Sequence, residues 1–191
     1  FKVRGAYVSI KRLDDRQKKS GVIAMSAGNH AQAVAWWAKK ASVKATIVMP
    51  EHAPLSKVMK TKSLGAKVIL KGRTLNESQS YVTELIDSQK LTLIHPYDDP
   101  NVIIGQGTLG LEFIEDVVKL EVLIVPIGGG GLISGIAIVA KALNPKIKIY
   151  GVQTEKFPSM YNVLHKKDLE ILGDTLADGI AVKRPGKITS E

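Results

Sequence analysis

Short apolar runs alternate with longer amphipathic stretches along the first half of the chain. The apolar runs at residues 22–25, 45–49, 66–70 and 91–95 have the length and composition of buried strands. Between them lie three stretches with helical patterns, at residues 29–41, 55–64 and 74–89. Strands that alternate with helices predict a parallel sheet covered by helices on both faces.

The same alternation returns after residue 100 and predicts a second α/β unit. We expect strands at residues 121–127 and 146–152, and helices at residues 103–119, 132–143 and 157–164. The linker His95–Asn101 contains two prolines and two aspartates, so we place a domain boundary there. The predicted fold class is therefore α/β, with two open parallel-sheet domains.

Composition narrows the class of protein. The 191 residues are 45% hydrophobic and 24% charged, which is typical of a globular protein, and no apolar run is long enough for a membrane helix. The absence of cysteine excludes disulfides, thiolate metal sites and a thiol nucleophile, and it favours a cytoplasmic location. The net charge of +9 comes from dispersed lysines, and aromatic residues are only 5%, so we expect no nucleic-acid partner and no membrane partner.

Four consecutive glycines, Gly128, Gly129, Gly130 and Gly131, separate a predicted strand from a predicted helix. Glycines at a helix N-terminus leave backbone N–H groups accessible, which favours phosphate binding. A flexible turn is the alternative. The run fits neither the G-x-G-x-x-G dinucleotide pattern nor the G-x-x-x-x-G-K-[ST] loop, so a single phosphate is the expected ligand.

The run Ser26, Ala27, Gly28, Asn29, His30 also lies between a predicted strand and a predicted helix. Its backbone donors, hydroxyl and amide suit a substrate carboxylate. The alternative is an ordinary helix cap formed by Ser26 or Asn29. A hydrogen-bonded packing role is the simpler interpretation of the His30 side chain.

Several motifs together resemble one family over nearly the whole chain. Their order and spacing resemble the threonine/serine dehydratases of the fold-type II pyridoxal-phosphate enzymes. That resemblance implies a fold like the tryptophan synthase β subunit and a chain that is part of a longer protein. It also implies a smaller domain at residues 21–99 and an incomplete larger, cofactor-binding domain at residues 1–20 and 100–191. The motifs are FKVRGA at 1–6, SAGNHAQ at 26–32, HPYDDP at 95–100, GQGT at 105–108, the glycines at 128–131 and ADGIAVK at 177–183.

The resemblance also implies roles for individual residues. Lys2 matches the catalytic lysine that carries pyridoxal 5′-phosphate, and Phe1 matches an aromatic residue beside the cofactor ring. Asn29 matches an amide that binds the ring hydroxyl, and Gly179 matches a backbone contact beside the ring. Residues Ser26, Ala27, Gly28, Asn29 and His30 match the substrate-carboxylate loop, and Gly128, Gly129, Gly130 and Gly131 match the phosphate-binding loop.

The implied reaction is dehydration and deamination of L-threonine or L-serine in a homo-oligomer, a dimer or a tetramer. Two alternatives stay open: a serine racemase, and a non-catalytic module that keeps the fold. Related racemases carry a second serine at the position of Ala27, which favours elimination here. A cation site in related enzymes places one ligand at Glu155, although the second acidic position falls at Tyr161. The partner of the pyridine nitrogen is expected beyond Glu191.

Overall fold

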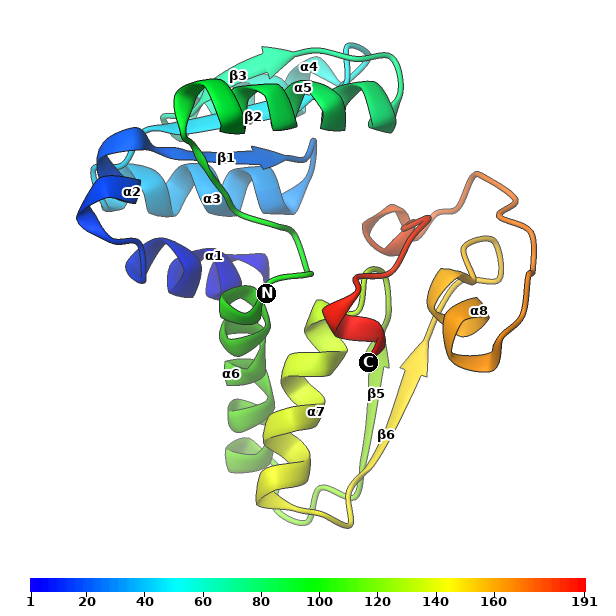
Figure 1. The fold of residues 1–191 in the computed structure, drawn as a ribbon. Helices are drawn as coiled ribbons and strands as arrows, with labels where there is room; N and C mark the ends of the chain where they lie inside the picture. The colour runs from blue at the N-terminus through cyan, green and yellow to red at the C-terminus, as the bar shows by residue number, and fades with distance from the viewer. The chain divides into compact units, whose positions relative to one another are not determined.

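The computed structural model divides into two compact units. It describes residues 1–191 apart from the side chains of residues 75 and 76. One unit comprises Lys2–Pro96, and the other comprises Tyr97–Glu191 together with Phe1. Figure 1 shows the elements of both units.

A four-stranded parallel sheet forms the centre of the unit Lys2–Pro96. Its strands lie in the order β3 (Lys67–Leu70), β2 (Ala45–Met49), β1 (Val22–Met25) and β4 (Thr92–Leu93). Every pairing is parallel, as the alternation of strands and helices predicted. The carboxyl ends of β1 and β4 therefore lie at the same edge of the sheet, which is the usual place for ligand sites in such folds.

Helices cover both faces of this sheet because successive side chains of a strand point to opposite sides. Ala24 packs in a core cluster with α3 (Asn29–Lys40) and α4 (Leu55–Ser63). Its neighbour Ile23 packs in a second cluster with α5 (Leu75–Gln89). The buried residues Ala6 and Ile10 of α1 (Lys2–Lys11) belong to the same cluster as α3.

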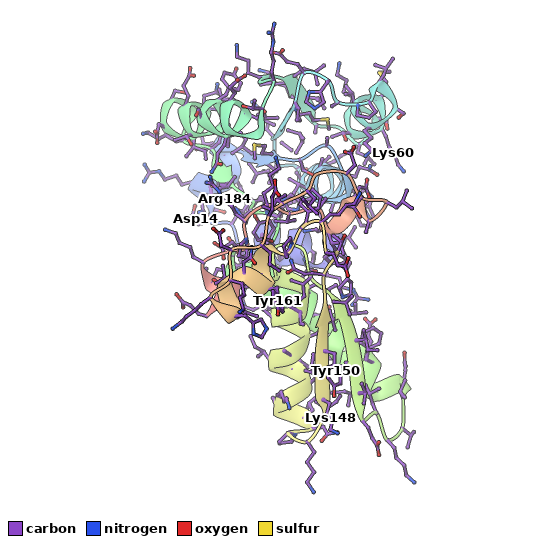
Figure 2. The ribbon with its side chains drawn as sticks, turned by 90° about the vertical axis from the view of Figure 1, so that its right-hand side faces the viewer. Asp14, Lys60, Lys148, Tyr150, Tyr161 and Arg184 are labelled. Carbon is purple, nitrogen blue, oxygen red and sulfur yellow. The ribbon has the colours of Figure 1, made fainter. Side chains whose placement is uncertain are left out.

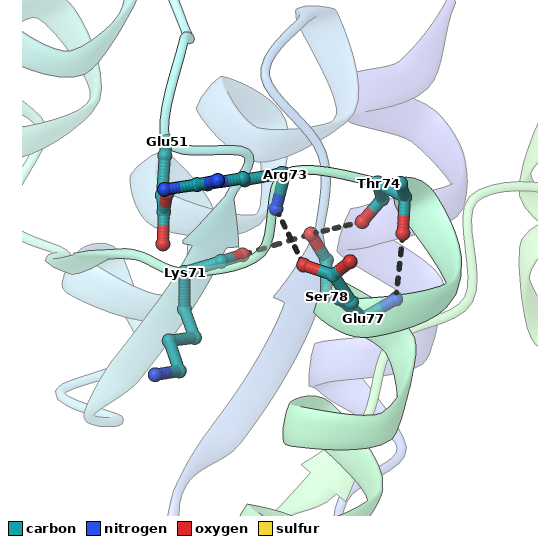
Figure 3. Close-up of polar contacts among 6 residues, drawn as sticks. All are labelled: Glu51, Lys71, Arg73, Thr74, Glu77 and Ser78. Atoms are coloured by element: carbon teal, nitrogen blue, oxygen red, sulfur yellow. Dashed lines mark hydrogen bonds and ion pairs between the residues drawn. The ribbon is translucent and has the colours of Figure 1, made fainter.

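The turn before α5 shows how local sequence sets the start of a helix (Figure 3). Thr74 caps the helix by accepting a hydrogen bond from Glu77 N at 3.2 Å, and the Glu77 carboxylate accepts from Arg73 N at 2.8 Å. Gly72 has a φ of +90°, and a Cβ there would lie 2.6 Å from Ser78 N. Only glycine fits this turn without strain.

The unit of Tyr97–Glu191 consists of two packed helices on a two-stranded parallel sheet. Helices α6 (Pro100–Asp116) and α7 (Gly131–Leu143) pack on β5 (Val122–Pro126) and β6 (Lys148–Val152). A short helix, α8 (Ser159–His165), follows, and two 3₁₀ turns, η1 (Asp178–Ile180) and η2 (Ile188–Ser190), lie in the tail. Figure 2 labels Lys148 and Tyr150 on β6 and Tyr161 on α8; all three side chains are exposed.

Glycine allows the backbones of α6 and α7 to touch. A Cβ on Gly135 of α7 would lie 2.4 Å from Ile103 O and 2.6 Å from Gly107 N of α6. Both atoms are backbone, so no side chain could move aside to make room. This close contact holds the helix that begins at the glycine run in a defined position.

Most predicted elements are confirmed, and three differ from the expectation. Helix α6 begins three residues earlier than expected, because Asp99 accepts from the N–H groups of residues 101 and 102 and Pro100 occupies the first turn. Strand β4 is shorter than expected. Helices α1 and α2 (Asp15–Ser20) were not expected, although Asp14 and Gln17 form a capping box that the sequence contains.

The bounds of the two compact units also differ from those of the expected domains. We expected residues 1–20 to group with residues 100–191, yet Lys2–Pro96 forms one compact unit. The cause is α1, which buries its apolar face against α3. The assignment of residues 1–20 to the cofactor-binding domain stays a prediction. Among the described residues, no helix is long and apolar enough to cross a membrane.

Candidate functional site

Lys2, at the start of α1, has a partly buried amine. Its Nζ donates a hydrogen bond to the backbone carbonyl of Pro96, which lies shortly beyond β4. Burial lowers the pKa of Lys2 from the ordinary lysine value of 10.5 to about 8. At pH 7 about a tenth of the amine is therefore unprotonated, far more than for an ordinary lysine, and a lysine needs this form to act as a nucleophile or base.

His30 is the buried histidine of α3 and contacts the same segment as Lys2. Its side chain is 3% exposed, and Nε2 lies 2.8 Å from the carbonyl oxygen of Ile94, two residues before Pro96. Burial and the nearby positive charge of Lys2 lower the pKa of His30 to about 3. The ring is therefore neutral near pH 7 and donates to Ile94, as expected for a packing histidine.

The loop at residues 26–29 connects β1 to α3 at the carboxyl edge of the sheet. Ser26 Oγ accepts a hydrogen bond from Gly28 N at 3.1 Å. Helix α3 begins without a hydrogen bond from any capping side chain, so neither Ser26 nor Asn29 acts as the helix cap. The first N–H groups of α3 are thus available to an anion, which supports carboxylate binding over the capping alternative.

The glycine run connects β5 to α7 in the other unit and packs closely on one side. A Cβ on Gly129 would lie 2.3 Å from the Tyr97 ring, and a Cβ on Gly131 would lie 2.6 Å from Tyr97 O. Gly130 has a φ of +97°, in the left-handed region that favours glycine. The positive φ and these close contacts show that the run is a packed loop rather than a flexible turn.

The backbone N–H groups of this loop are available to a ligand. Within the part of the chain that the structure describes, the N–H groups of Gly129, Gly130 and Gly131 donate to no protein acceptor. Helix α7 starts at Gly131 without a side-chain cap, so the positive end of its dipole adds to these donors. The loop therefore has the properties expected of a phosphate site.

Side chains that we had not singled out individually hold the glycine loop. Thr189 Oγ1 donates to Gly129 O at 2.6 Å, and Tyr97 Oη donates to Arg184 O at 3.0 Å. The Asp98 carboxylate accepts from the N–H groups of residues 187 and 188. Burial, with the negative charge of Asp98, raises the pKa of Tyr97. The HPYDDP motif marked Tyr97 and Asp98 as members of the family pattern, but no local pattern indicated these contacts.

The structure says less about the roles of the remaining predicted residues, Phe1, Gly179 and Glu155. Phe1 is 51% exposed. A Cβ on Gly179 would meet no atom within 4 Å, so the described packing does not require glycine there. Glu155 lines a surface hollow that Asp174 also lines, but the described residues contain no group of three or more acidic, histidine or cysteine side chains that could hold a metal ion. The cofactor and cation roles of these three residues stay predictions.

The predicted residues thus divide between the two units. Lys2 and residues 26–30 belong to the unit Lys2–Pro96, where Lys2 and His30 both contact the segment after β4. Residues 128–131, Gly179 and Glu155 belong to the other unit. The first group has an amine of lowered pKa beside a candidate carboxylate site, and the second has a candidate phosphate site.

Comparison with known proteins identifies the family. The chain belongs to the pyridoxal-phosphate dependent enzyme family, which matches over residues 1–191. It is 50% identical to L-threonine ammonia-lyase of Thermotoga maritima over 193 aligned residues, covering 100% of this chain and 48% of that protein. The chain spans about half the length of the curated relatives it matches.

Solved structures show the same fold. Threonine deaminase isoform 2 of Solanum lycopersicum is 39% identical with a TM-score of 0.92, covering 99% of this chain and 53% of that one. Maize serine racemase is 38% identical with a TM-score of 0.92, covering 99% of this chain and 58% of that one. These likenesses confirm the expected fold class, that of the fold-type II pyridoxal-phosphate enzymes.

Proposed function

We propose that the protein catalyses the pyridoxal-phosphate-dependent dehydration and deamination of L-threonine to 2-oxobutanoate and ammonia, and of L-serine to pyruvate and ammonia. The partly buried Lys2 amine, which donates to the Pro96 carbonyl and has a lowered pKa, carries this proposal. The similarity to an L-threonine ammonia-lyase over the whole chain supports the choice of substrate.

In this proposal each of the predicted residues has its own role. Lys2 would carry the cofactor, and its Nζ would act as the base that takes the α-proton of the substrate. The N–H groups of residues 128–131 would hold the phosphate, and Phe1, Asn29 and Gly179 would lie beside the ring. Residues Ser26–His30 orient the substrate carboxylate. The cofactor itself supplies an aldehyde that condenses with amines and a ring that accepts the electron pair of the α-carbon.

The visible absorption spectrum before and after borohydride, followed by peptide mapping, tests the assignment. We expect the protein to be yellow and borohydride to fix a pyridoxyl group on Lys2. Attachment at another lysine would contradict the role of Lys2. A colourless protein that pyridoxal phosphate cannot reconstitute would favour the non-catalytic alternative.

Serine racemase is the second candidate, because a serine racemase structure is also closely similar. Ala27 argues against it, since a methyl group cannot exchange a proton with the second face of the substrate. We expect 2-oxo acid and ammonia from serine, with little exchange of the α-proton into remaining L-serine and no D-serine. Rapid solvent-deuterium exchange with inversion would refute elimination as the main reaction. The variant Ala27→Ser should gain measurable racemisation.

The location, the oligomeric state and a cation site are further parts of the same proposal. We infer a cytoplasmic homo-oligomer, either dimer or tetramer, which light scattering after size-exclusion chromatography would test. A cation site at Glu155 predicts that Glu155→Gln lowers any activation by monovalent or divalent cations. Equal activation of the variant and the wild type would remove Glu155 from the site.

A further inference from the structure

The carbonyl group of Gly129 is held from two directions. Its oxygen accepts a hydrogen bond from Thr189 Oγ1 at 2.6 Å and another from Gly186 N at 3.2 Å. The peptide bond that follows Gly129 is trans and planar, so its C=O and the N–H of Gly130 point in opposite directions. The Gly130 N–H therefore points away from Gly186 and Thr189.

The glycine loop does not fix this direction by itself. The ψ angle of Gly129 and the φ angle of Gly130 can rotate together and reverse the peptide, and glycine permits both signs of φ at little steric cost. Gly130 precedes α7, so the helical hydrogen bonds do not restrain its N–H. The restraint on this donor must come from the atoms that hold the Gly129 carbonyl.

The segment that supplies this restraint is itself anchored. The Asp98 carboxylate accepts from Lys187 N at 3.0 Å and from Ile188 N at 2.9 Å. Ser190 Oγ donates to Gly186 O at 2.8 Å within the same turn. Thr189 also packs closely on the loop, because a Cβ on Gly130 would lie 2.6 Å from Thr189 Oγ1. The hydroxyl of Thr189 thus reaches the loop from a turn with a defined position.

We propose that Thr189 is a positioning residue for phosphate binding: its hydroxyl holds the Gly129 carbonyl so that the Gly130 N–H faces the phosphate. This inference rests on the proposed function, in which residues 128–131 bind the cofactor phosphate. Without the hydroxyl, Gly186 N remains as the single donor to Gly129 O. The Gly130 N–H then points to the phosphate for only part of the time.

The test compares binding of pyridoxal phosphate with binding of pyridoxal, which lacks the phosphate. Thr189→Val keeps the shape of the side chain without the hydroxyl, and Thr189→Ser keeps the hydroxyl. Thr83→Val is the matched control, because it removes the same kind of hydroxyl-to-carbonyl bond, from Thr83 Oγ1 to Gln79 O at 3.1 Å, on the exposed side of α5. Each cofactor-free protein is titrated by visible absorbance, and the ³¹P resonance of bound pyridoxal phosphate is recorded.

We expect Thr189→Val to raise the Kd of pyridoxal phosphate about tenfold, as loss of one charge-assisted hydrogen bond implies. Its Kd for pyridoxal should stay within about twofold of the wild type, which also shows that the variant folds. The ³¹P resonance should move in Thr189→Val. Both Thr189→Ser and Thr83→Val should retain the wild-type ratio of the two dissociation constants and the wild-type resonance.

Two results would overturn the positioning role: an unchanged ratio of the two dissociation constants in Thr189→Val, or the same change of this ratio in Thr83→Val. Failure of the phosphate site itself would give a different result, in the wild type. If the wild type binds pyridoxal phosphate no more tightly than pyridoxal, the glycine loop is not a phosphate site, and both fail together.

Discussion

Replacing Lys2 by methionine in the cofactor-free protein tests the cost of burying its amine. The pKa of Lys2 falls from 10.5 to about 8 on folding. At about 1.4 kcal/mol per pH unit, this change corresponds to about 3 kcal/mol of stability lost when the folded protein must hold a charged Lys2. Methionine has a similar length and no charge, so Lys2→Met should remove that cost.

The lowered pKa of Lys2 also sets the direction in which stability changes with pH. Between pH 8 and 10.5 the unfolded chain binds a proton at Lys2 more often than the folded protein does. The stability of the wild type therefore rises with pH through this window, relative to Lys2→Met. The free energy of unfolding, from urea denaturation at pH 7 and at pH 10, should show a difference between the two proteins that changes by about 2–3 kcal/mol.

A difference that stays constant from pH 7 to pH 10 would refute the reasoning, because the Lys2 pKa would then be the same in the folded and unfolded states. The exposed Lys148 provides the control. Lys148→Met removes the same charge from an exposed position on β6, and its effect should stay within about 0.5 kcal/mol at both pH values. An equal pH dependence in both variants would trace the effect to net charge.

Three further predictions concern the close contacts and His30. Gly129→Ala should lower the free energy of unfolding by about 1–3 kcal/mol in thermal or urea unfolding, because its Cβ would overlap the Tyr97 ring. Gly179→Ala should change the free energy of unfolding by less than about 0.5 kcal/mol. Similar effects of the two substitutions would contradict the close packing of Gly129. Gly135→Ala should cost at least as much as Gly129→Ala, since backbone atoms block its Cβ, and a wild-type Tm would show that α6 and α7 lie farther apart. The pKa of His30 falls from 6.5 to about 3 on folding, so the protein should lose stability as the pH drops through that range. In His30→Gln the free energy of unfolding should therefore depend less on pH on the acid side. An unchanged dependence on pH would contradict the burial of His30.

The patterns of hydrophobic and polar residues were sufficient to predict most of the elements. The strands at residues 22–25 and 45–49 match the structure residue for residue, because buried parallel strands are short apolar runs with clear ends. Helix α1 was missed because its buried face is small, with Gly5, Ala6, Ser9 and Ile10. Such residues give a weak periodic signal, and only the packing against α3 reveals the buried face.

The candidate site also has parts that the local sequence predicted and parts that it did not. Local sequence indicated the glycine loop and residues 26–30, because a glycine run or a polar loop between a strand and a helix offers backbone donors whatever the rest of the fold does. Lys2 carried no such signal, and only the resemblance singled it out.

Tertiary structure alone decided the properties that depend on distant parts of the chain. The lowered pKa of Lys2 comes from burial, and the Pro96 carbonyl that it contacts lies 94 residues away. The contact between Thr189 and Gly129 joins residues 60 positions apart. A sequence pattern records which backbone donors a loop can present, whereas the solvent around an amine and the direction of a peptide depend on what the fold packs against them.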